Sequence, residues 1–313
     1  MTPATVLVTC VQVQRTIDEH RDRLESFGLK LVLPEVRGQQ LSEAELLPLV
    51  PGVRGIIAGD DLISRRVIER ADALRIVSKW GVGLDNIDLV AAAEHGVKVT
   101  NTPGVFGDEV ADVVIGYLIL LARGLHTIDS GVRSGGWPKL VGFSLAARTI
   151  GIIGLGEIGS EVARRCLAMR MRVLGADPNS AAAAAARELG VELVDVEQLL
   201  RRADIVSLNC PLNPETHHLL DSSAFASMQF GAWLINTARG AVVDEPDLIE
   251  ALRTGRVAGA ALDVFEEEPL PPDSPLRTLP NVILGSHNSS NTEEAVRRTS
   301  ARAIENLLDG LAA

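Results

Sequence analysis

The sequence predicts an α/β protein of two domains, each with a parallel sheet covered by helices. The chain has 313 residues, which is too long for one ordinary hydrophobic core and suits two domains of about 150 residues. Short β-branched runs alternate with amphipathic or alanine- and leucine-rich stretches along almost the whole chain. That alternation is typical of parallel strands joined by crossover helices. A glycine-rich turn also joins one candidate strand directly to a candidate helix.

The first part of the chain is interpreted as one small α/β domain. Helix-like segments, among them residues 17–27 and 42–49, lie between short apolar runs. These runs are candidate strands because they are rich in β-branched residues. They cover residues 5–8, 29–33, 55–58, 75–78 and 97–100.

The second part of the chain begins with a strongly apolar segment at residues 108–123. Its length suits a helix that is buried or that packs against another subunit. An alanine-rich stretch at 181–186 predicts a helix, and the last helix is expected at about 292–308. The candidate strands here are residues 149–154, 172–177, 205–209, 233–236, 258–262 and 282–284.

Composition limits the classes of function. The net charge is −11, which argues against nucleic acid as a partner, because nucleic-acid-binding surfaces are usually basic. No apolar run approaches the roughly 20 residues of a membrane span, and the N-terminal residues do not resemble a signal peptide. The spacing of Cys10, Cys166 and Cys210 fits neither a zinc site nor a disulfide framework. We therefore expect a cytoplasmic protein without a metal or a membrane segment.

The glycine-rich turn predicts a dinucleotide site. It reads GLGEIG, and its glycines are Gly154, Gly156 and Gly159. These would allow a tight turn, close approach to a pyrophosphate, and close helix–strand packing, while the helix N-terminus favours phosphate. The next candidate strand ends at Asp177, where a carboxylate would meet a ribose diol. Because that charge repels a 2′-phosphate and no arginine follows in the next three positions, NAD is predicted rather than NADP.

Further motifs are similar to those of a known family. They are KWGVGLDNID at 79–88, NTPG at 101–104, NTARG at 236–240, ALDVFEEEP at 261–269 and the segment 281–287. In this order and spacing, together with the glycine motif, the chain resembles the D-isomer-specific 2-hydroxyacid dehydrogenases. It is most similar to a short form of D-3-phosphoglycerate dehydrogenase without a regulatory domain.

The resemblance implies two Rossmann-like or flavodoxin-like domains. The substrate domain would be discontinuous and comprise residues 1–100 plus 287–313. The NAD-binding domain, residues 101–286, would be inserted into it. The resemblance also implies a catalytic cleft between the domains and a homodimer.

Three residues are the candidate catalytic set. Arg239 follows a candidate strand and precedes a glycine, and a guanidinium there can bind a carboxylate in bidentate fashion. His287 follows the last candidate strand, and an imidazole can exchange the proton that accompanies hydride transfer. Glu268 stands immediately before a proline, as in the family, and would orient the imidazole.

The resemblance also implies residues that bind the ligands. Val82 and Gly83, with Arg239, would contact the substrate, and Lys79 is a further candidate substrate contact. The family's cofactor contacts fall on Glu157, Ile158, Asp177, Cys210, Thr237, Ala238, Asp263 and Ser290.

The sequence departs from the phosphoglycerate dehydrogenases at one strand end. Those enzymes usually carry an arginine where this chain has Asp60 and Asp61, and two acids are expected to repel a substrate phosphate unless it is held elsewhere, with Lys79 the first candidate. The expected function is interconversion of a small anionic 2-hydroxy acid and its 2-keto acid, as in 3-phosphoglycerate dehydrogenase. The alternatives are reduction of another keto acid, such as phosphonopyruvate, hydroxypyruvate or glyoxylate, and an NAD-sensing binding protein of the corepressor kind.

Overall fold

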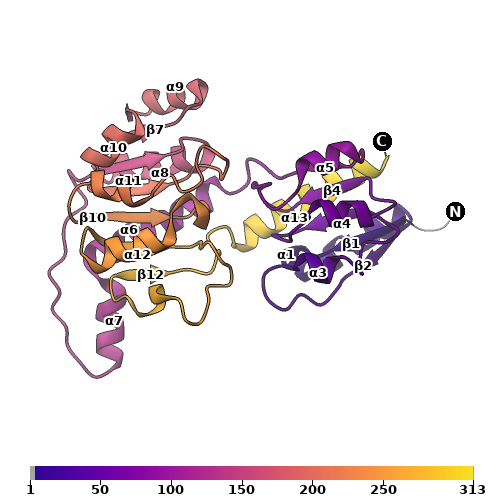
Figure 1. Cartoon of the computed structure of the whole chain (residues 1–313), viewed down its shortest axis with the longest axis horizontal. Coiled ribbons are helices and arrows are strands. Elements are labelled where there is room, and N and C mark those ends of the chain that lie inside the picture. The colour runs from indigo at the N-terminus through magenta and orange to yellow at the C-terminus, as the bar shows by residue number, and fades with distance from the viewer. Residues whose placement is uncertain (1–3, 313) are drawn as a thin grey trace. The chain divides into compact units, whose positions relative to one another are not determined.

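The computed structural model describes residues 4–312, and these form two compact units (Figure 1). One unit comprises the described residues up to Val105 together with those from Asn291 onward, and the other is Phe106–Ser290. The sequence analysis placed both boundaries a few residues earlier in the chain. The N-terminal and C-terminal parts of the chain thus meet in one unit, and the middle of the chain forms the other.

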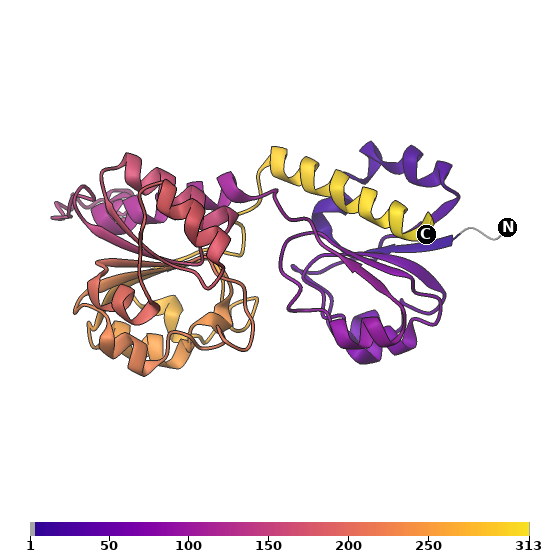
Figure 2. The same cartoon turned by 90° about the horizontal axis from the view of Figure 1, so that it is seen from above.

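The unit that contains both ends of the chain has a five-stranded parallel sheet of order β2-β1-β3-β4-β5. In Figure 2, α1, α2 and α13 cover one face of this sheet and α3, α4 and α5 cover the other. The strands are β1 (Ala4–Val8), β2 (Leu29–Val32), β3 (Val53–Ala58), β4 (Ile76–Lys79) and β5 (Lys98–Thr100). The helices are α1 (Val11–Arg15), α2 (Arg21–Ser26), α3 (Glu43–Leu46), α4 (Arg65–Arg70), α5 (Leu89–Glu94) and α13 (Glu293–Ala312).

The middle unit has a seven-stranded parallel sheet of order β12-β11-β10-β9-β6-β7-β8. Helices α6 and α8 lie on one face and α10, α11 and α12 on the other (Figure 2). The strands are β6 (Thr149–Ile153), β7 (Arg172–Ala176), β8 (Glu192–Leu193), β9 (Ile205–Leu208), β10 (Ala232–Asn236), β11 (Val257–Leu262) and β12 (Val282–Leu284). The helices are α6 (Gly107–Arg123), α7 (Leu125–Arg133), α8 (Glu157–Ala168), α9 (Ser180–Glu188), α10 (Val196–Arg202), α11 (Ser222–Ser227) and α12 (Glu245–Arg253).

The predicted fold class is confirmed, and each predicted strand matches an observed one to within one or two residues at either end. Strand β8 was not predicted, because its two residues give too short a pattern. The apolar helix α6 buries one face, with Val110, Val114, Leu118 and Leu121 at helical spacing. No single described helix is long and apolar enough to cross a membrane, although α6 and α7 taken together, bent by 67°, reach that length and composition.

Three predicted helices were wrong in extent. The segment 17–27 is a 3-10 turn, Ile17–Glu19, followed by the short helix α2, because it buries few apolar side chains and little packing supports a longer helix. Helix α3 ends at Leu46, and Pro48 follows, which has no N–H to continue the hydrogen-bond ladder. The last helix was longer than predicted and extends to Ala312.

Candidate active site

The glycine turn lies where the order of the seven-stranded sheet reverses. Strand β6 pairs with β7 on one side and β9 on the other, so the carboxyl ends of β6 and β9 form a topological switch point, where α/β sheets bind their ligands. Gly154 follows β6 with φ +90°, and a Cβ there would lie 2.7 Å from the carbonyl carbon of Asn209 after β9. Only glycine fits at this position.

The same turn leaves room for a phosphate at the start of α8. A Cβ on Gly156 would meet nothing within 4 Å, whereas one on Gly159 would lie 1.9 Å from the carbonyl oxygen of Gly154. Gly159 thus allows the helix to pack against the turn, and Gly156 keeps the helix N-terminus open. Thr237, after β10, has a buried hydroxyl oxygen with no hydrogen-bond partner among the described residues. These features fit a bound dinucleotide, since a ligand would satisfy the buried hydroxyl.

Asp177 links the glycine turn to the end of β7. Its Oδ2 accepts a hydrogen bond from the Leu155 N–H at 2.6 Å, and its Oδ1 accepts one from the Asn179 N–H at 2.7 Å. The carboxylate is therefore held beside the turn, at the strand end where the sequence analysis expected it to meet a ribose.

The other predicted cofactor residues have varied surroundings. The Glu157 carboxylate accepts a hydrogen bond from the Gly107 N–H at 3.0 Å, so its side chain caps α6. Asp263 is buried and accepts from the Ser289 N–H at 2.9 Å, so it also holds the loop after β12. Ala238 and Cys210 are buried, and burial raises the pKa of the Cys210 thiol to about 11. Ile158 and Ser290 are partly buried.

His287 and Glu268 form a close pair. Nδ1 of His287 lies 2.8 Å from Oε2 of Glu268, and the Phe265 N–H donates to Oε1 of the same carboxylate at 2.9 Å. The backbone N–H of His287 donates to the Asp263 carbonyl at 2.7 Å. Because an ionised carboxylate only accepts hydrogen bonds, Nδ1 carries a proton here and Nε2 is the ring nitrogen suited to proton exchange.

Arg239 lies on the loop after β10, next to the loop that carries Glu268. A Cβ on Gly240 would lie 1.8 Å from the carbonyl carbon of Phe265, so the two loops touch through their backbones. Strands β10, β11 and β12 are adjacent and parallel, and Arg239, Glu268 and His287 each follow one of them. The predicted catalytic set therefore comes from three neighbouring loops at one edge of one sheet.

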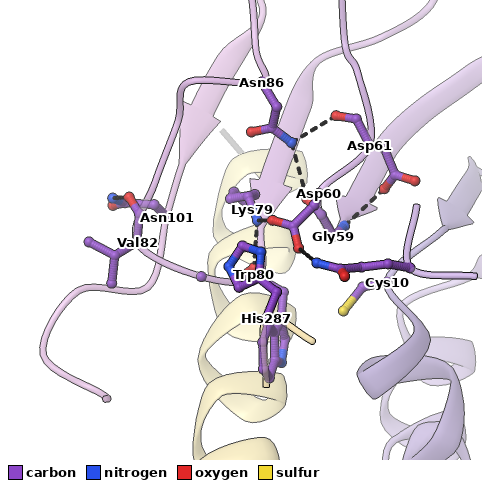
Figure 3. Close-up of polar contacts among 12 residues, drawn as sticks. Cys10, Gly59, Asp60, Asp61, Lys79, Trp80, Val82, Asn86, Asn101 and His287 are labelled. Carbon is purple, nitrogen blue, oxygen red and sulfur yellow. Dashed lines mark hydrogen bonds and ion pairs between the residues drawn. The ribbon is translucent and has the colours of Figure 1, made fainter. Parts of the chain in front are cut away.

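Lys79 ends β4 in the other unit, and its side chain is buried. Its Nζ lies 2.9 Å from Oδ1 of Asp60 and 2.9 Å from the carbonyl oxygen of Trp80 (Figure 3). Val82, in the following loop, is 43% exposed, and Asn101 donates to its carbonyl at 2.7 Å. Gly83 is partly buried in that loop.

The expectation that Asp60 and Asp61 both face a substrate phosphate was wrong for Asp61. Its side chain is fully buried and accepts hydrogen bonds from the backbone N–H groups of Leu41 and Gly59 at 2.7 and 2.9 Å, and from the Thr9 hydroxyl. Burial raises the pKa of the Asp61 carboxyl, and these hydrogen bonds oppose the rise. Asp61 thus fixes the loop after β3, and Asp60 alone lies beside Lys79.

Comparison with known proteins decides the family. Residues 115–289 match the family model described as D-isomer specific 2-hydroxyacid dehydrogenase, NAD binding domain. The chain belongs to this family. It is therefore an NAD-dependent oxidoreductase, and the family and cofactor predicted from the sequence are confirmed.

Individual relatives are named for different activities. The chain is 43% identical to the glyoxylate reductase of Korarchaeum cryptofilum over 79% of this chain and 76% of the relative. It is 38% identical to the D-3-phosphoglycerate dehydrogenase of Methanocaldococcus jannaschii over 86% of this chain but spans only 50% of that relative's length. Among solved structures, the TT0316 protein of Thermus thermophilus matches with a TM-score of 0.86 and 39% identity, over 98% of this chain and 97% of that one.

Asn236, the last residue of β10, is a site residue that the sequence analysis missed. It is 1% exposed. Its Oδ1 accepts from the Ala238 N–H at 3.0 Å, and its Nδ2 donates to the Arg239 carbonyl at 2.9 Å. The side chain thereby closes the turn that presents Arg239. An asparagine at the end of an apolar strand is the signal that could have identified it, because such side chains often bond to the backbone of a following turn.

Proposed function

We propose that this dehydrogenase interconverts a small 2-keto acid and the corresponding 2-hydroxy acid, with Arg239, His287 and Glu268 as the catalytic set. The observation that carries the proposal is the 2.8 Å contact between His287 and Glu268, at the sheet edge that also presents Arg239. An imidazole oriented by a carboxylate is suited to general acid–base work.

In this proposal Arg239 binds the substrate carboxylate and polarises the neighbouring keto oxygen. Val82 and Gly83 are further proposed substrate contacts, through their backbone N–H groups. Bound NADH supplies the hydride that adds to C2. As that C–H bond forms and the carbonyl π bond breaks, Nε2 of His287 gives its proton to the oxygen, and the Glu268 carboxylate orients the ring and stabilises its protonated form. Oxidation of the hydroxy acid runs the same transfers backwards.

We also propose that the active species is a homodimer in a reducing compartment such as the cytoplasm. Several large apolar side chains are exposed on α7 and the segment after it, which is unusual for a surface that faces only water. The free cysteines among the described residues are all buried, which is compatible with a reducing environment. The exposed side chains are Leu125, Val132, Trp137, Leu140 and Val141.

The test is NADH oxidation with a panel of keto acids: glyoxylate, hydroxypyruvate, pyruvate, phosphonopyruvate and 3-phosphohydroxypyruvate. We expect turnover of at least one of them, and Arg239→Ala should lose most of that activity while NADH still binds. Arg253→Ala, at the exposed end of α12, is the matched control and should retain activity. No turnover of any keto acid, with NADH bound normally, would contradict the proposal and favour a binding protein that senses NAD.

A further inference from the structure

A histidine that precedes α11 joins two loops of the candidate active site. The ring of His218 contacts two carboxylates: its Nε2 lies 2.9 Å from Oε1 of Glu266, and its Nδ1 lies 3.3 Å from Oδ2 of Asp244. Glu266 lies in residues 263–269, the Glu268 loop, and Asp244 ends residues 239–244, the Arg239 segment. The imidazole therefore connects the Glu268 loop to the Arg239 segment, and all of these residues belong to the middle unit.

The backbone around His218 is bound to the Arg239 segment. The His218 N–H donates to the Ala241 carbonyl at 2.8 Å, and the Leu220 N–H donates to the Val242 carbonyl at 3.1 Å. His218 has φ +50°, a left-handed conformation that is uncommon for residues other than glycine. Such a conformation persists where the surrounding contacts enforce it. The position of the ring is therefore fixed relative to the Arg239 segment.

The carboxylate of Glu266 is held from a second side. Its Oε1 also accepts a hydrogen bond from the Glu245 N–H at 3.1 Å, and the Glu266 N–H donates to Oε2 of Glu245 at 3.4 Å. Burial raises the pKa of the Glu245 carboxyl, and the charge of Glu266 adds to the rise.

The side chains of Asp244, Glu245 and Glu266 thus bring three carboxylates to one junction, where like charges repel one another. An imidazole N–H that donates to a carboxylate offsets this repulsion, because an ionised carboxylate only accepts hydrogen bonds. The contact between Nε2 of His218 and Glu266 is the shorter of the two ring contacts. Without it, the Glu268 loop would be held less closely to the Arg239 segment.

We propose that His218 is a positioning residue for the dehydrogenase reaction: through its contact with Glu266, it holds the Glu268 loop against the Arg239 segment. The inference rests on the proposed function and adds to it a residue outside the catalytic set. His218 touches neither substrate nor cofactor in this role, since it acts through Glu266. Its loss should therefore lower kcat and leave NADH binding unchanged.

The test measures kcat for the best keto acid, KM for NADH, and Tm. The single variants are His218→Asn, Glu266→Ala, Glu266→Gln and Glu268→Gln, and the double variant is His218→Asn/Glu268→Gln. Asparagine is chosen because it tolerates the left-handed conformation but lacks the imidazole. Glu267→Ala is the matched control, since it removes the neighbouring exposed carboxylate from the same loop. Circular dichroism checks that each variant is folded. If His218→Asn fails to fold, Glu266→Ala replaces it in both backgrounds.

We expect kcat to fall by about tenfold in His218→Asn and in Glu266→Ala. This is less than the roughly 100-fold loss that a misplacement of about 1 Å can cause, because the backbone contact at Gly240 still joins the two loops. Glu266→Gln keeps an oxygen that accepts both hydrogen bonds and should stay within about threefold of the wild type. Glu267→Ala should keep its kcat. KM for NADH should change by less than about twofold in all of these variants, because the glycine turn at 154–159 is unaltered.

The double variant separates positioning from simple stabilisation of the fold. A residue that acts by positioning Glu268 has little left to contribute once that carboxylate is gone, so the two effects should not add. In the Glu268→Gln background, His218→Asn should therefore lower kcat by about twofold or less.

Three results would overturn the inference. Wild-type kcat in both His218→Asn and Glu266→Ala would show that the contact does not position the loop. An equal fall in kcat on His218→Asn in both backgrounds would show that His218 only stabilises the fold. In these two cases the proposed dehydrogenase function stands. If the wild type binds NADH but turns over no keto acid, the proposed function fails and the inference fails with it, so the two kinds of failure are distinguishable.

Discussion

Gly240 offers a direct test of how the Arg239 loop is positioned. A Cβ at this residue would lie 1.8 Å from the carbonyl carbon of Phe265, 2.0 Å from its carbonyl oxygen and 2.3 Å from the Glu266 nitrogen. All three are backbone atoms, so no side-chain rotation can relieve the contact. Gly240→Ala must therefore separate the loop that carries Arg239 from the loop that carries Glu268.

The size of the effect follows from these distances. Non-bonded carbon atoms rest about 3.5–4.0 Å apart, so the two backbones must separate by roughly 1.5 Å or more at the point of contact. A misplacement of about 1 Å in an active site can reduce activity about 100-fold. Overpacking of this kind costs about 1–3 kcal/mol of the free energy of unfolding, which corresponds to a fall in Tm of about 2–12 °C for a domain of this size. We expect both losses in Gly240→Ala.

The assay is kcat/KM for the best keto acid, with Tm from thermal denaturation and NADH binding by fluorescence. Gly116→Ala is the matched control: it adds the same methyl group within α6, where a Cβ meets nothing within 4 Å, and alanine in a helix is favoured over glycine by about 1 kcal/mol. It should keep activity and not lower Tm. A Gly240→Ala protein with wild-type kcat/KM and Tm would refute the claim that contact between the two loops positions Arg239.

Three other predictions concern the site. Glu268→Gln removes the carboxylate oxygen that lies 2.8 Å from Nδ1 of His287 and holds the imidazole in position, so kcat/KM for keto-acid reduction should fall by about tenfold or more. An unchanged kcat/KM would show that the carboxylate does not act on the imidazole. Asp177→Ala should weaken NADH binding and narrow the preference over NADPH, both measured by fluorescence titration, and an unchanged preference would mean that the ribose is recognised elsewhere. Burial raises the pKa of the Cys210 thiol to about 11, which leaves little thiolate at neutral pH. Cys210 should therefore resist alkylation by iodoacetamide in the native protein but react in urea-unfolded protein, as measured by mass spectrometry. Rapid labelling of Cys210 in the native state would contradict this prediction.

Local sequence was sufficient to predict the strands and to identify the motifs. Strands are short, apolar and β-branched, so a local pattern locates them to within a residue or two. The glycine turn at 154–159 could also be predicted, because its spacing reflects local requirements of a strand–turn–helix connection. The NTARG and EEEP segments identified Arg239 and Glu268 as candidate catalytic residues through the family resemblance. They did not predict which other residues contact these two side chains.

Which polar groups meet could be learned only from the folded chain. Lys79 and Asp60 are 19 positions apart in the chain, and no local pattern shows that one is buried and neutralised by the other. Asp60 and its neighbour Asp61 looked alike in sequence, yet one carboxylate lies beside a lysine and the other is enclosed by backbone N–H groups. The roles of Asn236 and Gly240 likewise depend on a turn and on a contact with the next loop. Charge pairing and close backbone contact depend on distances between segments that are remote in the chain, and those distances are set by the packing of the sheet.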